Sequence, residues 1–217
     1  AAAAPPTAET RAALAADMVA SLPFLPRAAA ETGVATYLSD RPHRAFAVAP
    51  ERTSYWRATG MPTPAAAEQQ ALEGCQLRYG VPCLLFAVDD EIRRPAAGAD
   101  WSRHDMPRLR EAGATYDPQR IPLVPEARRR QPHIANYGAA PEPKAMALHP
   151  WGRAFVATGA ASQAAAEAAA LAACNNDGDR AGTDGPCFLY ASGNRVVLVE
   201  RSQAARAEAP AAPVAPA

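Results

Sequence analysis

Two segments, one in each half of the chain, alternate between small and large apolar residues. Residues 45–49 are Ala-Phe-Ala-Val-Ala, and residues 145–149 are Ala-Met-Ala-Leu-His. A large apolar side chain at every second position predicts a half-buried β-strand in each place. A second strand is expected after each of them, over residues 55–59 and 153–158. The hydrophobic pattern therefore predicts one strand pair in each half.

A helix is predicted after each strand pair. Thr63 is a favourable N-cap with Pro64 at the first helical position, and Ser162 is the equivalent cap in the second half. The residues that follow are rich in alanine, which is the best helix former. We expect these helices to end at the first cysteine of each half, Cys75 and Cys174.

A third strand is expected at the second cysteine of each half, over residues 83–88 and 187–192. Turn residues then lead to a fourth strand, which is clearest at 196–199. An amphipathic helix is expected near residues 8–20, before the first strand pair. We predict an α+β fold of two tandem ββαβ(β) repeats, each an antiparallel sheet with one helix and one disulfide.

The two halves match each other in order along the chain, which indicates a tandem duplication. Matches of Pro, Tyr, Gly and Cys are the informative ones, because alanine supplies 56 of the 217 residues. The matched segments are 22–26 with 121–125, Tyr37 with Tyr137, 44–50 with 144–150, 59–60 with 158–159, 71–72 with 170–171, Cys75 with Cys174, and 82–87 with 186–191. We predict an N-terminal tail and helix (1–21), repeat 1 (22–92), an Arg/Trp-containing connector (93–120), repeat 2 (121–200) and a flexible Ala/Pro tail (201–217).

Four cysteines allow three disulfide pairings, and the duplication selects one of them if each repeat is self-contained. Cys75 then pairs with Cys83, and Cys174 pairs with Cys187. Small repeats with few large apolar residues commonly need such cross-links. A four-thiolate zinc site and free thiols are the alternatives, although the spacings lack the short knuckle of structural zinc sites. Disulfides are typical of periplasmic or extracellular proteins, and we expect one of these locations.

One motif occurs twice and resembles a known family. It consists of an Ala-x-Ala strand, a glycine, a helix that ends in Ala-Leu-x-x-Cys, and a second cysteine that opens an apolar strand. The motif is Ala45-x-Ala47, Gly60, Ala71-Leu72-x-x-Cys75 and Cys83, and again Ala145-x-Ala147, Gly159, Ala170-Leu171-x-x-Cys174 and Cys187. This pattern resembles a family of secreted bacterial domains of unknown function. The resemblance implies secretion and a small α+β fold, and it assigns no catalytic residues.

Charge and composition exclude two classes of protein. The 22 basic and 22 acidic residues give a net charge of zero, which argues against a polycationic nucleic-acid-binding protein. No apolar run is long enough to span a membrane. Residues 1–6 lack the basic and apolar regions of a signal peptide, so we expect a mature chain from which a signal peptide has been removed.

Little in the chain points to catalysis. The sequence motifs of serine hydrolases, nucleotide-binding loops and zinc proteases are absent. His43, His104, His133 and His149 lie in predicted loops or beside prolines, and we expect them to be solvated. The catalytic candidate, if there is one, is His104 with its neighbour Asp105. No cofactor is expected.

The predicted connector and one aromatic residue supply the candidates for binding. Residues 93–130 contain nine arginines and five acidic residues, so this stretch either faces an anionic partner or is a solvated linker. An aromatic side chain in a loop can anchor a partner protein or stack on a glycan. The binding candidates are Trp101, Arg103, Arg108 and Trp151.

The loop between the last two cysteines has oxygen-bearing side chains at alternate positions, namely Asn175, Asp177 and Asp179. A calcium loop of this type requires glycine at its sixth position and glutamate at its twelfth, and this chain has Arg180 and Pro186 there. We therefore expect a polar loop insertion and no metal, with calcium binding by these three residues as the alternative.

These features favour a non-enzymatic interaction or structural module, an accessory subunit of a bacterial envelope or extracellular assembly with protein partners. The alternative is an envelope-polymer (glycan) binding protein or hydrolase that acts through the connector.

Overall fold

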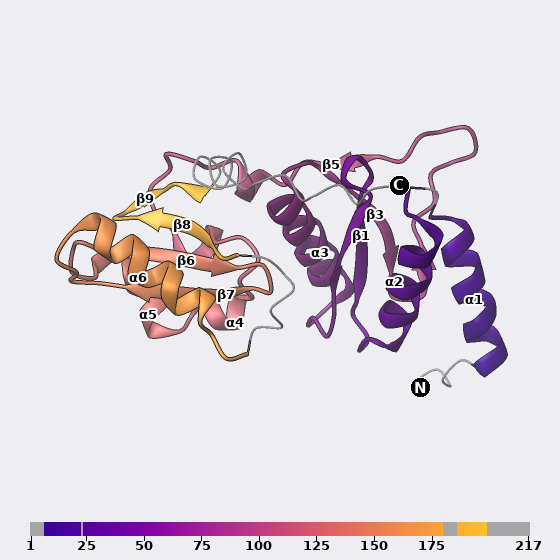
Figure 1. Cartoon of the computed structure of the whole chain (residues 1–217), viewed down its shortest axis with the longest axis horizontal. Coiled ribbons are helices and arrows are strands. Elements are labelled where there is room, and N and C mark those ends of the chain that lie inside the picture. Colours follow the sequence, from indigo (N-terminus) through magenta and orange to yellow (C-terminus); the bar gives the residue numbers. More distant parts are fainter. Residues whose placement is uncertain (1–6, 23, 180–185, 199–217) are drawn as a thin grey trace, which may run out of the picture. The chain divides into compact units, whose positions relative to one another are not determined.

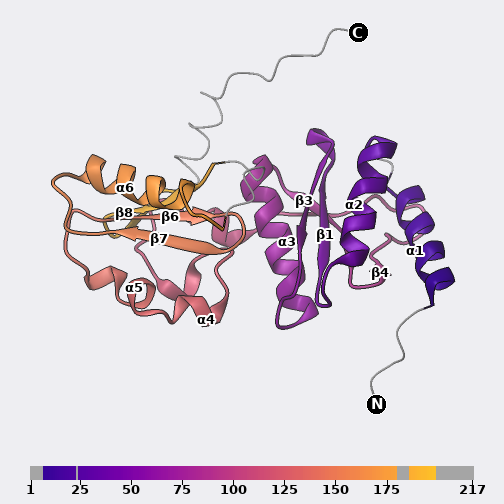
Figure 2. The same cartoon turned by 60° about the horizontal axis from the view of Figure 1, so that its bottom comes forward.

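The computed structural model of the chain describes residues 7–22, 24–179 and 186–198 (Figures 1 and 2). The chain divides into two compact units, unit 1 (Ala1–Met106) and unit 2 (Pro107–Ala217). The predicted tail at 201–217 and the last residue of the predicted fourth strand, Val199, lie outside the described residues.

Unit 1 is an antiparallel sheet with helices on both faces (Figure 1). Its elements are α1 (Ala8–Ala20), α2 (Arg27–Ser39), β1 (Ala45–Ala49), η1 (Pro50–Arg52), β2 (Ser54–Ala58), α3 (Pro64–Tyr79), β3 (Cys83–Val88), β4 (Glu91–Ile92) and β5 (Arg103–His104). The strand order is β2-β1-β3-β4, and β5 also pairs with β3. Helix α3 covers one face, and α2 covers the other with α1 outside it (Figure 2).

The sheet of unit 2 has the same strand order as the sheet of unit 1. Its elements are η2 (Pro107–Leu109), η3 (Pro118–Arg120), α4 (Glu126–Arg129), α5 (Pro132–Ala135), η4 (Tyr137–Ala139), β6 (Ala145–His149), β7 (Arg153–Ala157), α6 (Gln163–Asn175), β8 (Phe188–Ser192) and β9 (Arg195–Val196). The order is β7-β6-β8-β9, with α6 on one face and the short helices α4 and α5 on the other (Figure 2). The predicted α+β class with two antiparallel sheets is confirmed.

The prediction of one helix per repeat missed α2, the helix on the second face of the unit 1 sheet. It has no side-chain N-cap bond and Gly33 lies within it, and both features weaken the helix signal of the sequence. The helix is held in place by burial of Val34, Tyr37 and Leu38 against the sheet. Tertiary packing thus overrides the weak local propensity.

The central strands β1 and β6 are buried on both faces, so the prediction of half-buried strands was wrong. In β1, Phe46 and Val48 face α2, whereas the alternating alanines face α3. The alternation was a real signal, but the small side chains mark a closely packed helix and not solvent. Ala67 and Ala71 of α3 meet these alanines, which lets the helix approach the sheet.

Both predicted helix starts are confirmed, and one predicted helix end was wrong. The side chains of Thr63 and Ser162 accept hydrogen bonds from backbone N–H groups of the first turns. Helix α6 ends one residue after Cys174, but α3 continues four residues beyond Cys75. It stops at Gly80, which has a φ of 76° that glycine adopts without strain.

Both predicted disulfides are present, Cys75–Cys83 and Cys174–Cys187. Each one joins the helix that covers the sheet to the beginning of the next strand. The cysteines are buried in the clusters between helix and sheet, and no free cysteine is found.

In each unit, a buried tyrosine from the segment before the sheet forms a hydrogen bond with a turn of that sheet. The hydroxyl of Tyr37 donates to the carbonyl of Asp89, and that of Tyr137 donates to the carbonyl of Gly193, at 2.8 and 2.7 Å. Asp89 and Gly193 lie in the turns after β3 and β8, both with positive φ. A cation lies about 5 Å above each tyrosine ring, from Arg44 in unit 1 and from Lys144 in unit 2.

The predicted connector is divided between the two units and packed into both. In unit 1, β5 pairs with β3, and Trp101 packs on Phe86. In unit 2, Tyr116 is buried against Tyr137, and its neighbour Thr115 bridges to the start of β9. The segment contains three prolines and scattered apolar residues with no period, which is why it resembled a linker.

Replacing both Cys174 and Cys187 with alanine is expected to lower the free energy of unfolding by about 3 kcal/mol on the loop-entropy model. The Cys75–Cys83 disulfide closes a shorter loop, 8 against 13 residues. Replacing these two cysteines with alanine should therefore lower the free energy of unfolding by about 0.5 kcal/mol less. Urea denaturation of the two variants measures both values. Variants as stable as the oxidised parent would contradict the expectation.

Stability is expected to fall in alkali. Desolvation raises the pKa values of Tyr37, Tyr116, Tyr137 and Tyr190 above the ordinary value of a tyrosine. The unfolded chain then loses these protons first, so the contribution of these tyrosines to the free energy of unfolding is fully present below a pH of about 10 and is lost as the pH rises further. Denaturation curves over this range measure the slope.

The variant Tyr137→Phe provides the control for that slope. It should lose about 1 kcal/mol at neutral pH, because the bond to Gly193 is gone, and show a shallower alkaline decline than the parent. An unchanged slope would show that Tyr137 does not contribute to it.

Candidate binding groove

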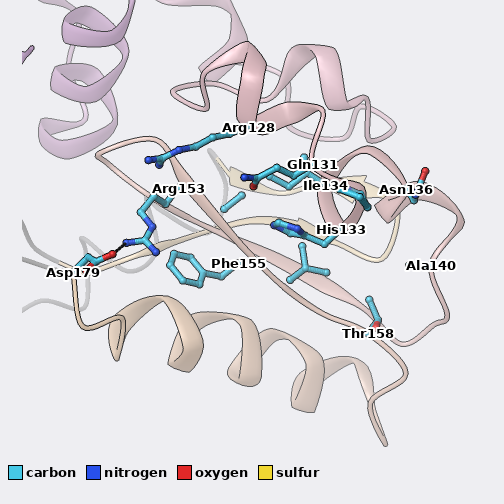
Figure 3. Close-up of a pocket in the computed structure, with 13 residues that line it drawn as sticks. Arg128, Gln131, His133, Ile134, Asn136, Ala140, Arg153, Phe155, Thr158 and Asp179 are labelled. Carbon is cyan, nitrogen blue, oxygen red and sulfur yellow. Dashed lines mark hydrogen bonds and ion pairs between the residues drawn. The ribbon is translucent and has the colours of Figure 1, made fainter. Parts of the chain in front are cut away.

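The candidate site is a cavity of about 740 Å³ along strand β7 of unit 2, which we call the β7 groove. Figure 3 shows β7 between helix α6 and the segment that contains α4 and α5. The residues that matter most for its shape and charge are Arg128, His133, Ala140, Ala154, Phe155 and Val156.

The corresponding place in unit 1 is filled. Ala154 pairs with Leu148 in the strand register, and the residue in the same position of unit 1 is Tyr55, opposite Val48. The Tyr55 ring stacks on Phe46 and lies against α2, where a Cβ added to Gly33 would be 2.8 Å from the ring. Alanine at position 154 leaves this volume empty in unit 2.

A second closing contact of unit 1 is also missing from unit 2. Arg57 and Asp40 form an ion pair that links β2 to the end of α2, with both side chains about four-fifths buried. The strand register makes Val156 the equivalent of Arg57. Ala140 is the equivalent of Asp40, because its carbonyl accepts from Lys144 as that of Asp40 accepts from Arg44. Two small apolar residues thus stand where unit 1 has an ion pair, and both line the groove.

Strand β7 is also at the edge of its sheet. It pairs with β6 on one side, and within the described residues no strand pairs with its other side. All five of its residues are half-buried, whereas Trp56 and Ala58 of the edge strand β2 in unit 1 are buried. An edge strand presents unpaired backbone N–H and C=O groups, so the groove contains hydrogen-bonding groups as well as apolar surface.

Two arginines stand at the end of the groove where β7 begins. Arg153 forms ion pairs with Asp177 and Asp179, at 2.6 and 2.8 Å. The exposed Arg128 donates to the neutral carbonyl of Gly152 at 3.1 Å, a bond that leaves further guanidinium N–H groups. Trp151 is next to Gly152 in the chain and has an exposed fraction of 42%. Among the described residues, it is the one large apolar side chain that is exposed.

The three proposed calcium ligands are occupied by protein groups. Asp177 and Asp179 bind Arg153, and Oδ1 of Asn175 accepts from the backbone N–H of Cys187 at 3.0 Å. Among the residues that the structure describes, no group of three or more His, Cys, Asp or Glu side chains is arranged to hold a metal ion. This loop therefore orients Arg153.

His104 and Asp105 lie next to each other in sequence and contact different elements of unit 1. His104 belongs to β5, whereas Oδ1 of Asp105 accepts from Nε2 of Gln76 on α3 at 2.7 Å. The same Gln76 accepts from the backbone N–H of Met106 at 2.8 Å. The geometry gives Asp105 a structural contact that holds the chain against α3.

The connector candidates for binding have separate surroundings. Trp101 is part of the unit 1 core beside Phe86, and Arg103 forms an ion pair with Glu51 at 2.5 Å. Arg108 belongs to unit 2, where it donates to the carbonyl of Ile121. The remaining candidate, Trp151, lies two residues before β7 in the chain and is not among the residues that line the groove. Two of the four predicted residues thus belong to unit 1 and two to unit 2.

The four histidines, all predicted to be solvated, differ in burial, and His43 and His104 are half-buried. His149 on β6 has an exposed fraction of 3% and accepts from the backbone N–H of Trp151 at 3.2 Å, so its prediction as a solvated residue was wrong. His133 on α5 is exposed and lines the β7 groove. Sequence reasoning missed His133, Arg128 and Ala154. The available signal was the mismatch between the repeats at Tyr55 and Ala154.

Together, the fold and the site define a class: a disulfide-bonded α+β protein of two units, one with large side chains packed between its edge strand and α2, and one with a lined groove along its edge strand. The chain matches no family model, no curated protein and no solved structure. The resemblance to a secreted bacterial family therefore stays a prediction. In the described parts of the chain, no helix has both the length and the apolar character to cross a membrane.

Added calcium is expected to leave the melting temperature unchanged, because Arg153 already neutralises the two aspartates of the last loop. Thermal unfolding in millimolar calcium and in chelator tests this. A higher melting temperature in calcium that disappears in Asp177→Asn would show that the loop binds the ion.

Proposed function

We propose that this protein is a non-enzymatic interaction module of a bacterial envelope or extracellular assembly, and that the β7 groove of unit 2 is where it binds a partner protein. The observation that carries the proposal is the difference between two otherwise similar sheet edges. Unit 1 closes its edge with Tyr55 and the Arg57–Asp40 pair, whereas unit 2 has Ala154, Val156 and Ala140.

Folding alone does not require this difference. Unit 1 shows that the same strand order accommodates large side chains at the edge, where they bury apolar area against α2. An open groove forgoes that stabilisation, since each large side chain buried contributes about 1.5–3 kcal/mol. Binding a partner is a function that requires open surface, and an exposed tryptophan with nearby arginines is typical of protein interfaces.

The chemistry of the groove supports binding over catalysis. Its polar groups are two arginines, two side-chain amides, one histidine, the hydroxyl of Thr158 and an aspartate already paired with Arg153. The groups of unit 2 whose pKa values are raised most by burial are tyrosines in its core, Tyr116, Tyr137 and Tyr190, and they are not among the residues that line the groove. The disulfides support a periplasmic or extracellular location.

The variant Ala154→Tyr tests the proposal, because it places in unit 2 the side chain that closes unit 1. The oxidised full chain and the variant are used to capture proteins from a native envelope extract, with mass spectrometry of what is retained. We expect a partner that the parent retains and the variant loses. Tyr55→Phe, at the same register position of unit 1, is the matched control and should retain it.

Equal capture by the parent and by Ala154→Tyr would contradict binding at the groove. Circular dichroism and the melting temperature of the variant establish that it is folded. We expect the spectrum of the parent and a melting temperature at or above that of the parent, since the cavity has room for the ring.

A further inference from the structure

The backbone of β7 presents a regular series of hydrogen-bonding groups to the groove. In an antiparallel pair, alternate residues direct their N–H and C=O groups to the partner strand, and the residues between direct theirs away from it. Strand β7 is paired with β6 over all five residues from Arg153 to Ala157, so its other side keeps this alternation along its length. At about 3.4 Å per residue, this is an edge of about 17 Å.

Side chains line that edge on both faces of the sheet. Ala154 and Val156 point to the face of α5, where Ile134 also lines the groove. Phe155 and Ala157 point to the other face and pack against the cluster formed with α6. A strand laid along β7 would place alternate side chains on these two faces, and the small residues on the α5 face leave space for its larger ones.

One end of the groove favours a negative group. The exposed Arg128 has a neutral carbonyl as its hydrogen-bond acceptor within the described residues, and its guanidinium has N–H groups beyond that bond. Arg153, by contrast, is neutralised by two aspartates. A carboxylate of the occupant near Arg128 would form a charge-assisted hydrogen bond.

We infer that unit 2 binds an extended segment of a partner polypeptide as an additional strand of its sheet alongside β7, with apolar side chains over Ala154 and Val156 and a carboxylate next to Arg128. This inference rests on the proposed function and names its mode of binding. A polypeptide backbone carries donors and acceptors at the spacing of the free edge, which a glycan does not.

The experiment uses a phage-displayed library of random linear dodecapeptides selected on the oxidised full chain. We expect enriched peptides to alternate apolar and polar residues and to carry an acidic residue near one end. Binding should weaken by about tenfold or more in Ala154→Tyr. It should weaken likewise when Ala140→Asp and Val156→Arg together restore the ion pair of unit 1. Tyr55→Phe should bind as the parent does.

Two readouts identify strand addition. Hydrogen–deuterium exchange of the complex should slow at alternate amides of β7. Two N-methylated forms of the best peptide, each modified at alternate residues, should differ: one loses the N–H groups that face β7 and binds about tenfold more weakly or worse, and the other binds nearly as before.

Several outcomes would overturn the inference. They are a library without enriched peptides, equal binding of both N-methylated forms, protection away from β7, or binding of envelope glycan fragments in place of peptides. Self-association through β7, seen by sedimentation and abolished by Ala154→Tyr, would make a second copy the occupant.

If Ala154→Tyr loses its envelope partner while peptides fail to bind, the proposed function stands and strand addition does not. If peptides bind but envelope capture is unchanged, the proposed function fails at this groove.

Discussion

The architecture of both units depends on one interaction, the hydrogen bond from a buried tyrosine to the turn after the third strand of the sheet. The turn residue is held from two sides. In unit 2, the N–H of Gly193 donates to the carbonyl of Lys144, and its own carbonyl accepts from Tyr137. Asp89 has the same two bonds with Arg44 and Tyr37 in unit 1. These bonds fix the chain that precedes the sheet against both its first strand and its last turn.

This interaction also positions the β7 groove. The side chain of Lys144 is buried, and its Nζ donates to the carbonyls of Gly138 and Ala140 while lying above Tyr137. A buried ammonium is tolerated only where such acceptors are present. Ala140 lines the groove, so the wall opposite β7 is held by the same bonds that close the core. The groove is therefore a preorganised cavity, which lowers the entropic cost of binding.

The sequence predicted the features that repeat, and it failed where they diverge or where packing decides. Cys75, Cys83, Thr63 and Ser162 act through local chemistry, so the disulfides and helix starts were predictable. Helix α2 was not predictable, because its sequence is a weak helix former stabilised by contacts with distant strands. The half-buried interpretation of β1 failed because alanine at alternate positions is compatible with solvent or with a close helix. The groove was missed because an absence of side-chain volume, as at Ala154, has no motif of its own.

An open sheet edge is a risk for aggregation, and unit 2 limits that risk by geometry. Strand β7 has five residues, begins with the ion-paired Arg153 and runs between α6 and the α4–α5 segment (Figure 3). Short edges and charged residues at an edge both oppose pairing with another sheet. A single extended segment is narrower than a sheet, so we propose that the position of β7 between these helices favours the occupant inferred above over another sheet.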